Sequence, residues 1–255
     1  AANALYSFAW YELCDWYIEF VKPIINGPAS QERTNTQLVM AHVLNRVMRL
    51  LHPFCPFITE ELYQKLPLKS KACIVDTYPT SINDKAFLSL GSKTAALEVD
   101  VVKEVISAIR NIRGENRISP AIKLRVRLAP NTAETQKLLG MNKTAIMTLG
   151  RIEDLHIGEE GSLSKCAVTP VVVDDASVKV IIPLEGLVDI EEEVKRIQKT
   201  IEKLTKDVSI LTGKLSNKNF VANAAEEVVE ADKKLLEQTR AQLSSLQEAL
   251  VRLSS

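Results

Sequence analysis

The stretch IEEEVKRIQKTIEKLTKDVSILTGKL, residues 190–215, decides how the last quarter of this chain folds. Its apolar residues recur at alternating steps of four and three: Ile190, Val194, Ile197, Ile201, Leu204, Val208, Leu211 and Leu215. This spacing places all of them on one stripe of an α-helix, the a/d seam of a coiled coil. The stretch therefore predicts a long helix that needs a second helix along that stripe.

A second seam follows in the sequence, and polar residues interrupt it at two places. Its members are Val229, Asp232, Leu236, Thr239, Leu243, Leu246, Leu250 and Leu253. The polar stretch KLSNKNFVANA, residues 214–224, separates the two seams and predicts a turn. We expect Phe220 and Val221 to cover the last seam layer and Asn223 to cap the second helix. Residues 187–255 are thus predicted to form an antiparallel two-helix coiled-coil hairpin.

Residues 121–186 have a different pattern. IKLRVRLA, residues 122–129, alternates apolar with polar side chains, as a half-buried strand does. A helical stretch over 133–149 follows, and then come three further strand candidates, IEDLHI (152–157), CAVTPVVV (166–173) and SVKVIIPL (177–184). This region predicts a small α+β subdomain.

Residues 1–120 are predicted to be a helical bundle. Apolar residues from Leu5 to Phe20 recur at three- and four-residue steps, and the same spacing continues over 31–51 and 93–113. A shorter helix is expected from Thr59 to about residue 66, after the prolines of HPFCPF break the chain. The overall class is therefore mainly α, with a bundle, a small α+β subdomain and a hairpin.

Composition bounds the function. The formal net charge is zero, so any anion binding must come from local patches. No apolar run is long enough to cross a bilayer, and the start lacks a signal peptide and reads as part of a helix from a longer protein. The four cysteines form no CxxC pair, and the three histidines do not cluster with them in the sequence. We therefore predict no metal site and a reducing, cytoplasmic setting.

Two basic clusters are the candidate binding residues, and we predict no catalytic residue in this chain because no triad or phosphate loop is present. The cluster in the first hairpin helix and its turn consists of Lys195, Arg196, Lys199, Lys203, Lys206, Lys214 and Lys218. Only Glu202 and Asp207 oppose these cations between residues 195 and 218. They either form a solvated exterior with ion pairs or follow a phosphate backbone.

The second cluster lies in AIRNIRGENRISP, residues 108–120. On a helix Arg110, Arg113 and Arg117 would share one face. These arginines either stabilise the C-terminal end of a helix, where cations interact favourably with the helix dipole, or contact a ligand, and both interpretations stay open. The aromatic residues Trp10, Tyr11, Trp16 and Tyr17 have helical spacing, which favours core packing over stacking on bases.

Several stretches together carry a family resemblance. ALYSFAWYELCDWYIE followed by LLHPFCPFITEELYQKL resembles the anticodon-binding bundle of the class Ia aminoacyl-tRNA synthetases for valine, isoleucine and leucine. IRNIRGENRISP is similar to that family's IRNIRxExNISP pattern. The hairpin, with KLSNKNFVANAAEEVVE, resembles the C-terminal arm of the valyl branch. Departures are Tyr63 for a common Trp, Gly114 for Ala, the altered ENRIS and Ala225 for a Pro.

The resemblance implies a function that the residues alone do not. The intact enzyme would attach valine to tRNA(Val) with ATP and Mg, which would be bound by a domain absent from this chain. This chain would then be catalytically silent, hold no cofactor, and bind tRNA through bundle and arm, with no DNA or membrane partner and as a monomer. The alternative is a coiled-coil module for protein interaction or dimerisation.

Overall fold

The computed structural model describes residues 2–67, 69–80, 85, 89, 91–162, 164–188, 190–217 and 226–254, except for the side chains of 192, 193, 226, 227 and 254. It divides into two compact units, residues 1–96 and 97–255. This division falls inside a helix, away from the boundary expected near residue 120, and the three-part domain scheme stays a prediction. No helix among the described residues is long and apolar enough to span a membrane.

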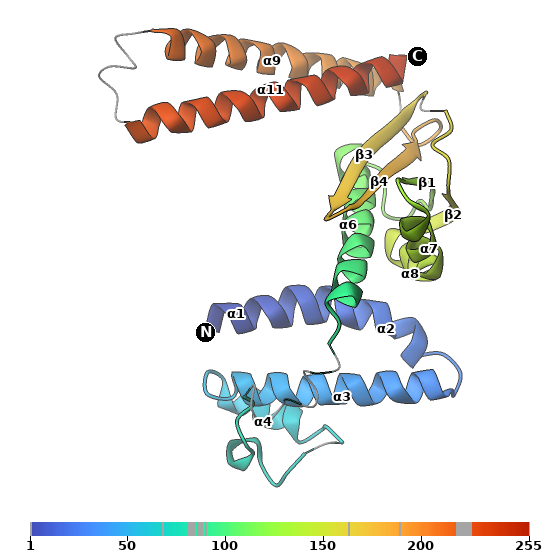
Figure 1. Cartoon of the computed structure of the whole chain (residues 1–255), viewed down its shortest axis with the longest axis vertical. Helices are drawn as coiled ribbons and strands as arrows, with labels where there is room; N and C mark the ends of the chain where they lie inside the picture. The colour runs from blue at the N-terminus through green and yellow to red at the C-terminus, as the bar shows by residue number, and fades with distance from the viewer. Residues whose placement is uncertain are drawn as a thin grey trace. The chain divides into compact units, whose positions relative to one another are not determined.

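The first unit is helical. Three consecutive segments, α1 (Ala2–Ser7), the π-helix η1 (Phe8–Tyr17) and α2 (Ile18–Ile25), run beside α3 (Gln31–Leu51) (Figure 1). A turn at 26–30 joins them, and the Ser30 hydroxyl caps α3 by accepting from the Arg33 N–H at 3.1 Å. The described residues of this unit also form helix α4 (Pro56–Tyr63) and the short 3₁₀ helix η2 (Cys73–Val75).

Helix α4 begins three residues earlier than predicted. Pro56 occupies its first turn, where a missing N–H costs no hydrogen bond. Thr59 is therefore inside the helix; it is 1% exposed, and its hydroxyl donates to the Cys55 carbonyl at 2.8 Å.

The second unit is built on a four-stranded mixed sheet. Its strands are β1 (Leu124–Pro130), β2 (Ile152–Ile157), β3 (Cys166–Val173) and β4 (Ala176–Pro183), in the order β2-β1-β4-β3. β1 and β2 are parallel, whereas β4 is antiparallel to both β1 and β3. Parallel neighbours need a crossover connection, which α7 (Ala133–Met141) and α8 (Lys143–Gly150) supply.

The predicted helix over 133–149 is thus two helices. The break is at Asn142, whose carboxamide bonds back to the Leu138 carbonyl at 3.0 Å and competes with helix continuation. Helix α6 (Lys93–Glu115), predicted as a bundle helix, instead contributes a buried apolar face to this second unit. That face consists of Val101, Val102, Val105, Ile106, Ala108, Ile109 and Ile112.

The hairpin consists of α9 (Ile190–Ser216) and α11 (Glu226–Ser254), which lie side by side in Figure 1. Every predicted seam residue of both helices is buried or half-buried, and nearly all the flanking residues are exposed. The mainly α class with a small α+β subdomain and a two-helix hairpin is therefore confirmed. Phe220, Val221 and Asn223 lie outside the described residues.

The base of the hairpin is tied to the sheet. The Lys165 N–H donates to the Arg252 carbonyl at 2.9 Å, and the Leu184 N–H donates to the Lys165 carbonyl at 2.9 Å. Leu253 is 5% exposed, so the last turn of α11 is anchored by packing as well as by main-chain bonds.

Candidate nucleic-acid interface

The cations of α9 lie outside the seam. Lys195, Arg196, Lys199, Lys203 and Lys206 are all exposed, and we call these five residues the α9 basic strip. Residues three or four apart are neighbours on a helix surface, so the strip is continuous over about 16 Å of helix at 1.5 Å per residue. Two acids lie within or next to this span, the exposed Glu202 and the half-buried Asp207, and three more, residues 191–193, come just before it. The strip therefore presents a concentrated positive potential on a chain of zero net charge.

The two other predicted arm cations have different settings. Lys214 Nζ lies 2.6 Å from Oδ2 of Asp232, one of the polar seam residues, whose side chain is 15% exposed. Lys214 therefore has an ion-pair partner on α11 of the same chain. Lys218 lies outside the described residues, and its role in binding stays a prediction.

Arg113 is the most deeply buried arginine of the signature around residues 108–120. It is 9% exposed, and its guanidinium donates to the carbonyls of Ser119, Ile122, Gly150 and Arg151 at 3.0, 2.8, 3.3 and 3.3 Å. Burial lowers the pKa of Arg113, which still leaves an arginine charged at neutral pH. Four of the five N–H donors, those of the two Nη atoms, are thus used within the chain, which favours a structural role for Arg113 over contact with a ligand.

Arg110 and Arg117 do not form a common face with Arg113. Arg110 is exposed and donates to the Leu149 carbonyl at 3.2 and 3.3 Å. Arg117 lies beyond the end of α6, with a φ of 53°, and its N–H donates to Gly114 while the next N–H, of Ile118, donates to Arg113. These bonds form a Schellman motif, in which a left-handed residue ends the helix. The shared helix face expected from the spacing is wrong, because the helix stops before Arg117.

A cleft in the first unit was not expected from the sequence. Its lining is His52, Pro56, Phe57, Glu60, Glu61, Gln64 and Ile74, around about 360 Å³. Phe57 is 91% exposed. Trp10 and Tyr11 are also exposed, by 54% each, so the predicted core role does not hold for them. The stretch HPFCPF, residues 52–57, supplies three residues of the cleft lining and could have indicated it, but we interpreted its prolines only as a helix break.

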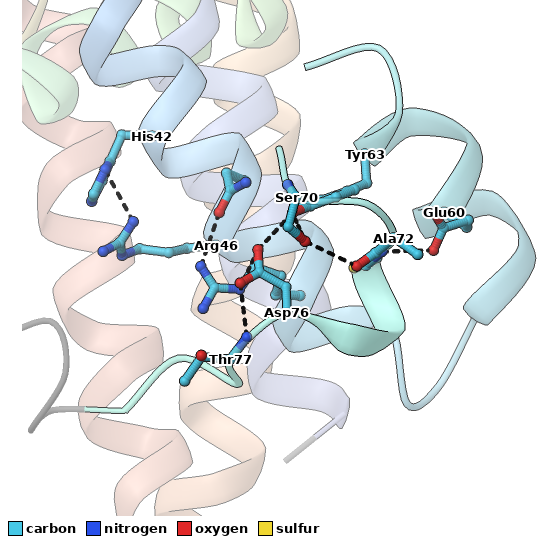
Figure 2. A network of polar contacts seen from close by, with 11 residues as sticks. His42, Arg46, Glu60, Tyr63, Ser70, Ala72, Asp76 and Thr77 are labelled. Carbon is cyan, nitrogen blue, oxygen red and sulfur yellow. Dashed lines mark hydrogen bonds and ion pairs between the residues drawn. The ribbon is translucent and has the colours of Figure 1, made fainter. Parts of the chain in front are cut away.

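A polar network of the first unit connects the loop after α4 to α3 and α4 (Figure 2). The hydroxyl of Tyr63, which is fully buried, donates to Asp76 at 2.5 Å and accepts from the Ser70 N–H at 2.7 Å. Asp76 also lies 3.6 Å from Arg49 of α3. The Tyr63 hydrogen bond is the main reason that the pKa of Asp76 is lowered. A Trp at position 63 would lack this hydroxyl, so the Tyr found here serves the loop directly.

Comparisons with known proteins agree with this geometry. Residues 1–128 match the family model described as "Anticodon-binding domain of tRNA ligase", and residues 189–254 match "Valyl tRNA synthetase tRNA binding arm". The chain is 68% identical to a valine--tRNA ligase of Bdellovibrio bacteriovorus over 99% of its own length and 28% of the relative's.

More distant relatives have the same description. A valine--tRNA ligase of Geobacter sulfurreducens is 39% identical over 92% of this chain and 26% of the relative. One of Enterococcus faecalis is 36% identical over 91% of this chain and 26% of the relative. The chain thus spans just over a quarter of the length of these curated relatives. With the family model covering half its residues, it belongs to the anticodon-binding domain family of tRNA ligases.

Proposed function

We propose that this chain is the tRNA-binding C-terminal part of a cytoplasmic valine–tRNA ligase, with tRNA(Val) as its partner and the hairpin as its arm. The observation that carries the proposal is the α9 basic strip, which remains exposed after α11 has filled the seam. Activation of valine with ATP and Mg would belong to parts of the enzyme outside this chain. We expect no aminoacylation from the chain alone.

The arm is suited to phosphates rather than to bases. Lysine ammonium groups are mobile point charges, and contacts to phosphate position a nucleic acid without reading its sequence. If four strip cations each neutralise one phosphate, affinity falls by about 50- to 150-fold between 50 and 200 mM salt.

The first unit is suited to unpaired bases. Specific RNA recognition uses loops whose bases stack on aromatic side chains and form hydrogen bonds with polar groups. The exposed Phe57, beside Glu60, Glu61 and Gln64 at the cleft, supplies both types of contact. Carboxylates there would accept from base amino groups but would repel phosphates, which favours a base over the backbone at this position.

The test is a fluorescence titration of tRNA(Val) with the chain at several salt concentrations. Lys199→Glu with Lys203→Glu should weaken binding more than tenfold and lower the salt slope by about 1.4 to 1.8. The matched control is Lys233→Glu with Lys234→Glu, which reverses the same charge at exposed positions of α11 and should change affinity less than threefold. Equal losses in both variants, or no binding at low salt, would contradict the proposal.

The seam does not favour the alternative of a dimerisation module. Its residues on α9 are covered by α11 of the same chain, and Lys214 and Asp232 pair across the two helices. We therefore propose a monomer. Light scattering that gives a concentration-independent dimer would refute it.

A further inference from the structure

Three side chains of metal-ligand type meet beside the cleft. His52 follows α3, Glu60 lies on α4 and Cys73 begins η2, and one ligand atom of each lies within 4.8 Å of the others. They are distant in sequence, which is why the separated histidines and cysteines gave no metal prediction. Cys73 is buried at 4% exposure, whereas His52 and Glu60 are half-buried and line the cleft.

The hydrogen bonds around His52 determine which of its nitrogens is available. Its Nδ1 lies 2.8 Å from the Thr59 hydroxyl, and that hydroxyl has its single proton committed to the Cys55 carbonyl at 2.8 Å. When the hydroxyl donates to that carbonyl it accepts from His52, so that Nδ1 carries the proton and Nε2 keeps its lone pair. A metal-binding histidine typically has this arrangement, with its second nitrogen held by an outer partner.

Glu60 is oriented in the same way. Its Oε2 accepts from the Cys73 N–H at 2.9 Å, and its Oε1 accepts from Gln64 at 2.6 Å. Each oxygen still has a lone pair, and the hydrogen bond to the Cys73 main chain holds the carboxylate at the start of η2, within 4.8 Å of the thiol.

We propose that His52, Glu60 and Cys73 form a binding site for a single Zn²⁺ ion, with its fourth position open toward the cleft. One nitrogen, one sulfur and one oxygen ligand suit zinc, which takes such ligands tetrahedrally. Tetrahedral ligands lie about 3.5 Å apart, so the three side chains need to close by about 1 Å. Binding replaces the S–H bond of Cys73 with an S–Zn bond, and the proton leaves to solvent.

This site is independent of tRNA binding by the arm, and either proposal can fail without the other. Its consequence is structural: the ion would add a bond between the end of α3, α4 and η2, which are already connected by hydrogen bonds, packing and the Arg49–Asp76 ion pair. The loop carrying Cys73 also carries Asp76, so the metal would stabilise the wall of the cleft behind Phe57.

Cobalt(II) is the spectroscopic substitute that tests the site on the whole 255-residue chain. We expect one Co²⁺ per chain, a thiolate-to-cobalt charge-transfer band, and loss of that band when stoichiometric Zn²⁺ but not Mg²⁺ is added. Cys73→Ser should abolish the band and weaken Zn²⁺ binding at least about 100-fold. The matched control is Cys166→Ser, which alters another buried cysteine and should leave the band unchanged.

A second variant covers the case in which Cys73→Ser does not fold. His52→Gln keeps the thiol, so it should retain a weakened band with at least about tenfold lower affinity. Circular dichroism checks that each variant is folded. No band with the unaltered chain, or a band that survives in folded Cys73→Ser or is lost in Cys166→Ser, would overturn the proposal.

Discussion

Replacing Arg113 with Met tests whether this signature arginine is structural. Met keeps the unbranched apolar stem but is shorter and has no guanidinium, so it removes the donors to the four carbonyls of Ser119, Ile122, Gly150 and Arg151. Those carbonyls come from the segment after α6 and from the α8–β2 junction, so Arg113 connects parts of the second unit that are distant in sequence.

The magnitude follows from the separate bonds. The two shorter ones, at 2.8 and 3.0 Å, are charge-assisted and each contribute about 1.5 kcal/mol or more. The two bonds at 3.3 Å, to Gly150 and Arg151, contribute less. After the substitution the Ser119 carbonyl still accepts from the Ile122 N–H, and the Arg151 carbonyl still accepts from the Leu124 N–H. Because Arg113→Met no longer buries a charged guanidinium, part of the stability lost with these hydrogen bonds is regained. The net cost is about 3 kcal/mol, or about 6 to 12 °C in melting temperature for a unit of this size.

Urea unfolding followed by circular dichroism measures this cost. The matched control is Arg110→Met, which loses bonds to one carbonyl at an exposed position and should cost less than about 1 kcal/mol. Below its melting temperature, Arg113→Met should bind tRNA as the unaltered chain does. Equal stabilities for the two variants, or a folded Arg113→Met that has lost tRNA affinity, would refute the structural role.

Three further outcomes are expected. Arg117→Gly should raise stability by up to about 1 kcal/mol in urea unfolding, because it relieves a left-handed residue, and a loss would contradict the Schellman assignment. Asp232→Leu should raise the melting temperature of the hairpin, because a leucine in the seam avoids the cost of burying a carboxylate, and this gain exceeds the loss of the ion pair with Lys214. A lower melting temperature would show that the ion pair is net stabilising. The pKa of Asp76 is lowered in the folded state, so ionised Asp76 adds to the free energy of unfolding above pH 3.8, the ordinary pKa of this group, and this stabilisation is lost as the pH falls further. Tyr63→Phe removes the main cause of the lowered pKa, so the stability of this variant should depend less on pH in the acid range, as measured by unfolding at several pH values.

Local patterns were enough to predict most elements. Strands β2 and β3 and helix α3 begin and end where the sequence placed them, because alternation and three- to four-residue spacing are properties of a few neighbouring residues. The split at Asn142 was missed, since one side chain bonding back to Leu138 changes a helix without changing its apolar spacing.

Spacing was a poorer guide to the binding residues. It grouped Arg113 with Arg110 and Arg117, yet burial against carbonyls more than 30 residues away decided what Arg113 does. It separated His52 from Cys73, which the turn after α3 and the loop after α4 bring together. No pattern of nearby residues records which distant carbonyl or thiol will be a neighbour.

The hairpin can be derived from the amino-acid sequence alone. Its seam repeats through two helices joined by a short link, so each layer finds its partner within the same stretch of chain, and the cations between seam positions had to face outward. In contrast, which arginines bond to the main chain, and which ligand-type side chains meet, depends on contacts between distant segments. Those contacts join segments whose separation is fixed by the packing of the whole unit, and packing is a property of all its residues together.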